Sequence, residues 1–177
     1  MKYDAKIQWA LDKMDTELLD HCMSVQGLTR MVCREIGMGS GAELMEKAAL
    51  LHDIGKIFIP QTILDKPGKL TKIEREVVDL HAYFSYRVLM EMGFEDIICQ
   101  TVLLHHGRDK PYVGGKPDII PQAGEYAEIL RTVDAFDALT SDRPYRDSYP
   151  QKQAVRILRE EGYSLEPVIA AIEKSFI

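Results

Sequence analysis

Apolar residues recur at helical spacing along almost the whole chain, and this periodicity limits the fold more than any other feature of the sequence. Around His81, for example, Val77, Phe84 and Val88 fall at positions that share one face of a helix. The sequence contains no Asn, and no Asp-Gly pair marks a hairpin turn. It therefore predicts an all-α fold, a single compact bundle of about seven to eight helices.

Capping and turn-forming residues set the predicted boundaries. Two stretches have the S/T-x-x-E form of a capping box, beginning at Ser40 and at Thr71, and Gly55 suits the turn that follows the first of these helices. Residues 59–68 are expected to be mostly loop with one helical turn, and residues 107–124 to be the longest irregular stretch and an active-site rim. The predicted helices cover approximately residues 7–11, 17–36, 40–52, 71–92, 94–106, 125–140, 151–161 and 165–176.

The composition fits one globular domain spanning residues 1–177, because 46% of the residues are hydrophobic and 28% are charged. No uncharged apolar stretch approaches the roughly 18 residues of a membrane span, and the charged start of the chain lacks the apolar region of a secretory signal. A cytoplasmic protein without a membrane segment is expected. The three scattered cysteines, Cys22, Cys33 and Cys99, form no CxxC pair and argue against a disulfide framework or a thiolate zinc site.

The charge balance restricts the class of partner. The chain has 22 basic and 28 acidic residues and a formal net charge of −6, which is a poor match for long nucleic acid. A small anionic substrate remains compatible if metal ions and a few placed Lys or Arg compensate its charge locally. The sequence leaves the oligomeric state open.

One face of the second predicted helix carries metal-capable groups. Glu17 and His21 are four residues apart and project from the same face, which continues through Val25, Leu28 and Val32. A carboxylate and an imidazole in line with an apolar stripe point inward, where an unpaired carboxylate costs several kcal/mol. This pair therefore needs a cation or a hydrogen-bonding partner.

The remaining histidines also lie on inward faces or at the ends of inward-facing helices. His52 and Asp53 end an apolar run, His81 and the pair His105-His106 continue apolar stripes, and Asp134 and Asp137 share a side of their helix. All five histidines of the chain and four carboxylates thus belong to one predicted interior. The ligand-capable residues are Glu17, His21, His52, Asp53, His81, His105, His106, Asp134 and Asp137.

This donor set predicts a catalytic metal centre. Imidazoles with carboxylates and no thiolate suit iron or manganese best, and zinc, magnesium and nickel are compatible. The number of ligands indicates two or three divalent ions. Such a centre can generate a metal-bridging hydroxide near neutral pH and can hold both oxygens of a phosphoryl transfer.

Several cationic residues lie where they could contact a phosphate. Lys56 follows His52 by four residues and could stabilise charge on a phosphate oxygen or a leaving group. Arg143 and Arg146 follow the Asp134 helix, and a guanidinium binds phosphate bidentately. Lys66 is a weaker candidate phosphate contact.

The ordered motifs resemble those of the HD-domain metal phosphohydrolases and, within them, the HD-GYP cyclic di-GMP phosphodiesterases. The resemblance covers roughly residues 17–176. It rests on these segments, in order: Leu50-Leu51-His52-Asp53-Ile54-Gly55-Lys56, Ile63-Leu64-Asp65-Lys66-Pro67-Gly68-Lys69-Leu70-Thr71, His81, His105-His106, and Asp134-Ala135-Phe136-Asp137-Ala138-Leu139-Thr140-Ser141-Asp142-Arg143-Pro144-Tyr145-Arg146.

The resemblance implies roles for individual residues. The implied metal ligands are His52, Asp53, His81, His105, His106 and Asp134, with Asp53 as a bridge. Glu17 and His21 match the additional upstream ligands of trinuclear members. Lys56 would be the catalytic lysine. Asp137, Arg143 and Arg146 would surround the substrate phosphate.

The sequence departs from the family pattern after the histidine pair. The family reads HHExxDGxGYP, whereas this chain continues as His105-His106-Gly107-Arg108-Asp109-Lys110-Pro111-Tyr112-Val113-Gly114-Gly115. The acidic third residue and the GYP triplet are absent, and Ile119-Ile120-Pro121 then rejoins the pattern. The resemblance therefore supports the metal chemistry more firmly than the substrate.

The leading hypothesis is a metal-dependent phosphodiesterase in which a metal-bridging hydroxide attacks phosphorus in line. Cyclic di-GMP is the first substrate expected. One alternative is a phosphohydrolase of another nucleotide or small phosphoester, because the altered loop could reshape the pocket. Two others are a di-iron oxygenase and a non-catalytic signalling module that binds a nucleotide or a partner protein.

Overall fold

The described part of the chain is helical, as the periodicity predicts. The computed structural model describes residues 4–107, 118–142, 147–163 and 165–177, and these ranges contain no β-strand. Within them, no helix combines the length and the apolar character needed to cross a bilayer. The elements are α1 (Ala5–Leu11), α2 (Thr16–Glu35), α3 (Gly41–Leu51), the 3-10 helix η1 (Ile54–Phe58), α4 (Gln61–Leu64), α5 (Lys72–Asp79), α6 (His81–Glu91), α7 (Asp96–Leu104), α8 (Pro121–Thr140), α9 (Gln151–Glu160) and α10 (Glu166–Phe176).

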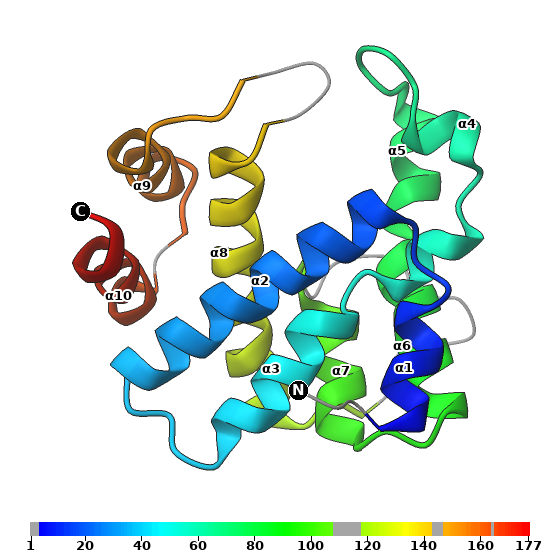
Figure 1. Cartoon of the computed structure of the whole chain (residues 1–177), viewed down its shortest axis with the longest axis horizontal. Helices are drawn as coiled ribbons and strands as arrows, with labels where there is room; N and C mark the ends of the chain where they lie inside the picture. Colours follow the sequence, from blue (N-terminus) through cyan, green and yellow to red (C-terminus); the bar gives the residue numbers. More distant parts are fainter. Residues whose placement is uncertain (1–3, 108–117, 143–146, 164) are drawn as a thin grey trace.

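The long helix α2 crosses the bundle diagonally and packs on α3, α8 and α10 (Figure 1). Helix α7 packs against α3, α6 and α8, and η1 packs closely on α6. In the view of Figure 1, α9 and α10 lie on one side of α8, and α1 and α4–α6 lie on the opposite side of the molecule. The centre of the bundle is therefore enclosed by α2, α3, α7 and α8.

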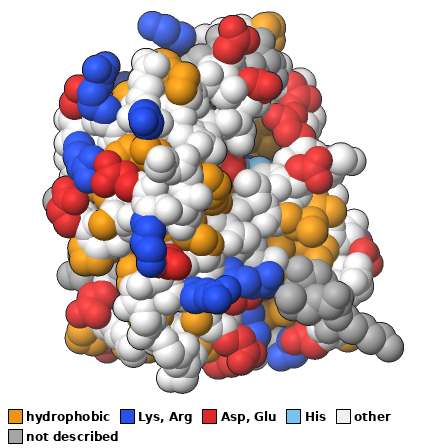
Figure 2. Space-filling view, turned by 60° about the vertical axis from the view of Figure 1, so that its left-hand side comes forward, with side chains coloured by type: hydrophobic (Ala, Val, Ile, Leu, Met, Phe, Trp, Pro, Cys, Tyr) orange, Lys and Arg blue, Asp and Glu red, His pale blue; other side chains and the backbone are white. Residues whose placement is uncertain are grey.

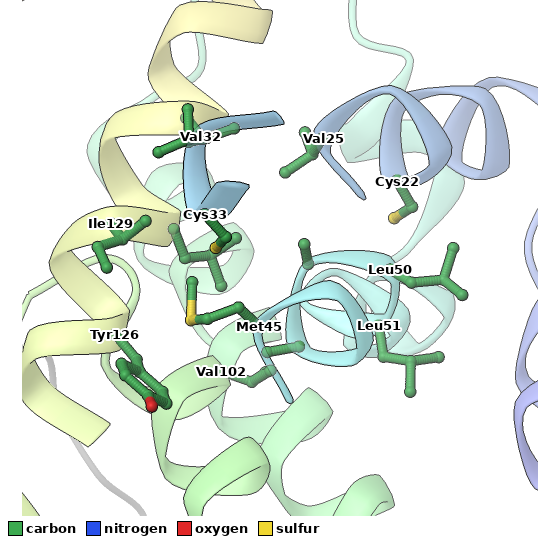
Figure 3. Close-up of a cluster of buried hydrophobic side chains, with 14 of the residues drawn as sticks. Cys22, Val25, Val32, Cys33, Met45, Leu50, Leu51, Val102, Tyr126 and Ile129 are labelled. Carbon is green, nitrogen blue, oxygen red and sulfur yellow. The ribbon is translucent and has the colours of Figure 1, made fainter. Parts of the chain in front are cut away.

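These four helices share one apolar core (Figure 3). Val25 of α2, Met45 and Leu50 of α3, Val102 of α7 and Leu130 of α8 are all fully buried. A fully buried aliphatic side chain contributes about 1.5–3 kcal/mol relative to an exposed one, so this cluster holds the four helices in a fixed arrangement. The metal-capable residues are placed by that arrangement.

The two predicted capping boxes have different outcomes. At the start of α5, Thr71 Oγ1 accepts from the N–H of Glu74, and Glu74 accepts from the N–H of Thr71, so this box is confirmed. At the start of α3, Ser40 makes no side-chain capping bond, because its backbone is already helical with φ −65° and ψ −20°. The helix begins where the sequence predicts, but the prediction of a capping box at Ser40 is wrong.

One predicted helix is divided into two. The sequence predicts a continuous helix over residues 71–92, whereas the structure has α5 and α6 separated at Leu80. His81 opens α6, and its Nδ1 lies 2.5 Å from the carbonyl oxygen of Val78 near the end of α5. The division places His81 at a helix junction, where periodicity alone gives no signal.

Gly55 is required by close packing rather than by turn geometry. Its φ is not positive, and its N–H donates to Ser85 Oγ of α6 over 2.8 Å. A Cβ added at this position would lie 2.1 Å from the carbonyl oxygen of His81 and 2.5 Å from the backbone nitrogen of Ser85. Only glycine lets η1 approach the backbone of α6 this closely. The approach brings the Asp53 end of η1 beside His81.

Gly55→Ala is expected to destabilise the fold by about 1–3 kcal/mol, because both clashing groups belong to the α6 backbone and cannot rotate away. Urea unfolding of the chelator-treated protein measures this change. Gly27→Ala in α2 is the matched control, because a Cβ there meets nothing within 4 Å, and it should leave stability unchanged or raise it by up to about 1 kcal/mol. Equal unfolding midpoints for Gly55→Ala and the wild type would contradict the packing argument.

Candidate metal centre

Three histidines are presented at helix ends. His52 follows α3, His81 lies two residues after the end of α5 and opens α6, and His105 follows α7. The last carbonyl groups of a helix lack partners further along it, so a nearby ring N–H can donate to them. In each case Nδ1 lies beside the carbonyl oxygen three residues earlier. The acceptors are those of Ala49 at 2.8 Å, Val78 at 2.5 Å and Val102 at 2.5 Å. This contact keeps a proton on Nδ1, so that Nε2 is the ring atom turned toward the centre and available to a metal ion once it carries no proton.

The Nε2 atoms gather around the carboxylate of Asp53, whose side chain is 2% exposed. His81 Nε2 lies 3.0 Å from Asp53 Oδ1, and His52 Nε2 lies 3.3 Å from Asp53 Oδ2. His21 approaches from α2, with its Nε2 3.5 Å from Asp53 Oδ2. His106 completes this side, with its Nε2 3.0 Å from that of His81. Asp53 is thus the common neighbour of imidazoles from several helices.

Three buried atoms of this group make no hydrogen bond within the described residues: His52 Nε2, Asp53 Oδ1 and His105 Nε2. Buried polar atoms almost always have a partner, because leaving one unpaired costs several kcal/mol. The unpaired atoms here are two imidazole nitrogens and a carboxylate oxygen, which are ligands of divalent cations. The residues present therefore fit a metal centre.

Ligand atoms lie within 4.8 Å of one another in three overlapping sets, and Asp53 belongs to two of them. The sets are Asp53-His81-His105-His106, His21-His52-Asp53 and His52-His105-Asp134. They contain all the ligands expected from the sequence except Glu17. Glu17 is exposed, one turn before His21, and its role as a ligand stays a prediction.

His21 is oriented by a side chain rather than by a helix end. It lies within α2, where the backbone carbonyls serve the helix, and its Nδ1 lies 2.8 Å from Asp137 Oδ2. Ser24, one turn further along α2, donates its hydroxyl to the other oxygen of Asp137. Asp137 is 3% exposed, contacts His21 and is not among the residues that line the adjacent pocket. This position suits a role in orienting His21 better than the contact with substrate that the resemblance implies.

Burial keeps two of the histidines neutral. It lowers the pKa of His105 well below the ordinary value, with the neighbouring His106 adding to the effect. Burial and then His81 lower the pKa of His106 to about 4. Neutral imidazole is the form that binds a metal, so these two side chains are ready ligands at neutral pH.

The carboxylates are held in their ionised form. Burial acts to raise the pKa of Asp53, but His52 and Lys56 outweigh it and hold the pKa well below its usual range. Burial likewise opposes the charge of His21, but hydrogen bonds to Asp134 and Asp137 raise its pKa to about 10. A cation that enters beside His21 must therefore displace a proton, and the affinity for it should rise with pH.

Lys56 connects this centre with a pocket of about 760 Å³. Its Nζ lies 2.5 Å from Asp53 Oδ2. Burial opposes its charge, but Asp53 outweighs burial and raises the pKa of Lys56, so the side chain is an ammonium at neutral pH. Lys56 and His21 both lie in the pocket wall, which is completed by the start of α2, by α4, by α5 and by the chain that joins them. From another side of the molecule, Figure 2 shows histidine surface recessed in a hollow.

The other predicted phosphate contacts have separate outcomes. Lys66 lies in the pocket wall, but its Nζ is bonded to both carboxylate oxygens of Glu74, at 2.8 and 2.7 Å. Arg143 and Arg146 lie outside the described residues, as does most of the altered segment after His106. Sequence reasoning missed Ser24, although its spacing of three from His21 on one helix was a usable signal.

Comparison with known proteins agrees with this geometry. The profile of the HD domain matches residues 8–166. The chain belongs to the HD-domain family. The histidines and aspartates that gather around Asp53 all fall inside the matched range.

Two relatives of similar sequence have names that state an enzymatic activity. The "3'3'-cGAMP-specific phosphodiesterase 3" of Vibrio cholerae is 31% identical over 160 residues, which is 88% of this chain and 34% of that protein. The "cyclic di-GMP phosphodiesterase response regulator RpfG" of Xanthomonas campestris is 36% identical over 84% of this chain and 40% of its own length. The chain thus spans between a third and two-fifths of the length of these HD-domain relatives.

A solved structure supports the fold. The HD domain of the L. monocytogenes phosphodiesterase PgpH, solved with cyclic-di-AMP, superposes with a TM-score of 0.67 over 95% of this chain and 93% of that one. Its sequence is 17% identical, so the likeness concerns the arrangement of helices. The all-α HD-domain bundle expected from the sequence is confirmed.

Asp137→Asn is expected to weaken binding of the metal ion beside His21 by about 10–100-fold, the usual effect of removing the partner that orients a ligand. Competition with a coloured chelator measures the affinity, and elemental analysis counts the ions. Ser24→Ala is the matched control: it keeps the His21–Asp137 contact, and its loss should be smaller than for Asp137→Asn. Unchanged affinity and stoichiometry in a folded Asp137→Asn protein would show that His21 does not depend on Asp137.

Proposed function

We propose that this HD domain is a metal-dependent phosphodiesterase that cleaves a cyclic dinucleotide, with cyclic di-GMP as the first substrate to test. The observation that carries the proposal is the set of unpaired His52, Asp53 and His105 atoms, close to a lysine that lies in the wall of a pocket. The pocket volume is in the range of small-molecule sites, roughly 300–1,000 Å³.

The metal ligands are proposed to be His21, His52, Asp53, His81, His105, His106 and Asp134, with Glu17 as a further candidate. Divalent ions held there would supply a nucleophile at neutral pH and Lewis-acid stabilisation of the phosphoryl group. Iron and manganese suit these ligands best.

Lys56 is proposed to act on the phosphate itself. It is protonated and faces both Asp53 and the pocket, so a phosphodiester at the mouth of the centre would lie within its reach. Its ammonium group would stabilise charge that develops on phosphate oxygens and could give a proton to the departing ribose oxygen. Asp53 would keep Lys56 oriented and its charge intact.

The names of the relatives support the substrate class. Both the cyclic di-GMP and the 3'3'-cGAMP relatives are named for cleavage of a cyclic dinucleotide. The sequence differs from the family's HHExxDGxGYP pattern from Gly107 to Gly115, and residues 108–117 lie outside the described part, so cyclic di-GMP and 3'3'-cGAMP are both substrates to compare.

The test is hydrolysis by protein purified without oxygen and loaded with iron or manganese. Cyclic di-GMP is expected to yield a linear dinucleotide or mononucleotide, and a chelator should abolish the reaction. Lys56→Met should lower kcat by about 10²–10³-fold, the usual effect of removing one group that stabilises the transition state.

The control variant is Lys72→Met, because Lys72 is an exposed lysine of α5 outside the pocket. It should leave turnover at the wild-type level. Metal content is measured for each variant, so that a loss of ions is not mistaken for a loss of catalysis. Absence of turnover of both cyclic dinucleotides by fully metallated wild type would reject the proposal.

A further inference from the structure

The pocket beside the metal centre has a cationic wall, although the whole chain carries a formal charge of −6. Five basic and three acidic side chains line it. The basic ones are Lys13, Lys56, Lys66, Lys69 and Arg75, and the acidic ones are Asp15, Glu17 and Asp65. A local excess of positive charge within an acidic protein needs an explanation specific to this pocket.

Three of the five cations already interact with a neighbouring side chain of the protein. Lys56 is paired with Asp53, Lys66 is paired with Glu74, and Lys13 lies over the ring of Trp9 at 5.6 Å. These contacts tie the side chains to the protein.

Lys69 and Arg75 are the remaining cations. Among the residues that the structure describes, neither makes an ion pair or a side-chain hydrogen bond, and both are exposed in the pocket wall. Within the described residues, none of the three acidic side chains of the wall forms an ion pair with Lys69 or Arg75; Asp15 accepts from the N–H of Leu18, and Asp65 accepts from Gln61. The charges of Lys69 and Arg75 are thus left facing the pocket.

The segment that carries both residues is held in place by Glu74. Its carboxylate accepts from Lys66 Nζ and from both the N–H and the hydroxyl of Thr71. These bonds tie the chain before α5 to the first turn of α5, with Lys69 and Arg75 on the same stretch. The backbone that carries the two cations is therefore held beside the pocket.

Lys69 and Arg75 are also separate from the reacting centre. His21 and Lys56 belong to α2 and η1, whereas Lys69 and Arg75 belong to the chain before α5 and to α5 itself. A cyclic dinucleotide has two phosphodiester groups within one ring. When one of them is at the metal centre, the other must lie elsewhere in the same pocket.

We propose that Lys69 and Arg75 bind the second phosphate of the substrate, the one that is not cleaved. This inference rests on the proposed function and adds to it a requirement for a substrate with two phosphates. Arg75 supplies a guanidinium fork and Lys69 a mobile ammonium group. Lys66 then has a positioning role through Glu74, in place of the direct phosphate contact expected from the sequence.

The test compares two substrates in the metal-loaded protein. Cyclic di-GMP has two phosphates, and bis(p-nitrophenyl) phosphate has one. In the double variant Lys69→Gln/Arg75→Gln, the ratio of kcat/KM for cyclic di-GMP to kcat/KM for bis(p-nitrophenyl) phosphate is expected to fall about tenfold or more, as two charged hydrogen-bond donors are lost. The fall should come from KM rather than from kcat.

The matched control is Lys72→Gln/Arg156→Gln, which removes the same charge from exposed positions on α5 and α9 outside the pocket. It should keep the wild-type ratio. An unchanged ratio in Lys69→Gln/Arg75→Gln, or an equal fall in the control, would overturn the second phosphate site.

A binding measurement separates this inference from the proposed function. Isothermal titration of the metal-loaded protein with cyclic di-GMP should give an affinity about tenfold weaker for Lys69→Gln/Arg75→Gln than for wild type. If wild type cleaves neither substrate, the proposed function fails and the titration alone decides the phosphate site. Equal affinities, or no binding by wild type, would overturn it.

Discussion

The centre depends on one local interaction, the hydrogen bond from a histidine Nδ1–H to a carbonyl near the end of a helix. His52, His81 and His105 each make it to the residue three positions earlier. The bond gives a partner to a carbonyl near the helix end and fixes the direction in which Nε2 points. Packing of η1 on α6, allowed by Gly55, then brings two of these helix ends together.

Asp53 places a negative charge at the centre of this group of histidines. It is a buried carboxylate among imidazoles and Lys56, with its pKa held far below normal. Without a cation, protons on neighbours such as His21 balance the negative charge, and burial keeps His105 and His106 neutral. The same charges that favour metal ions therefore also keep Lys56 cationic beside the pocket.

Much of the fold and the centre could be predicted from the sequence, because both depend on local patterns. Helical periodicity gave α2, α9 and α10 to within a few residues, and inward-facing histidines identified the group around Asp53. The division of helix 71–92 was missed, because it accompanies a side-chain contact, that of His81 Nδ1 with a backbone carbonyl oxygen near the break.

The contacts between segments that are far apart in the sequence could not be predicted from it either. His21 and Asp137 are 116 positions apart, and only the packing of α2 on α8 brings them together. Anomalous diffraction from crystals of the metal-loaded protein tests the centre most directly. At least two peaks should share Asp53 and lie within about 2.0–2.2 Å of Nε2 atoms of the helix-end histidines. Loaded crystals with no peak within coordination distance of Asp53 would contradict the assignment.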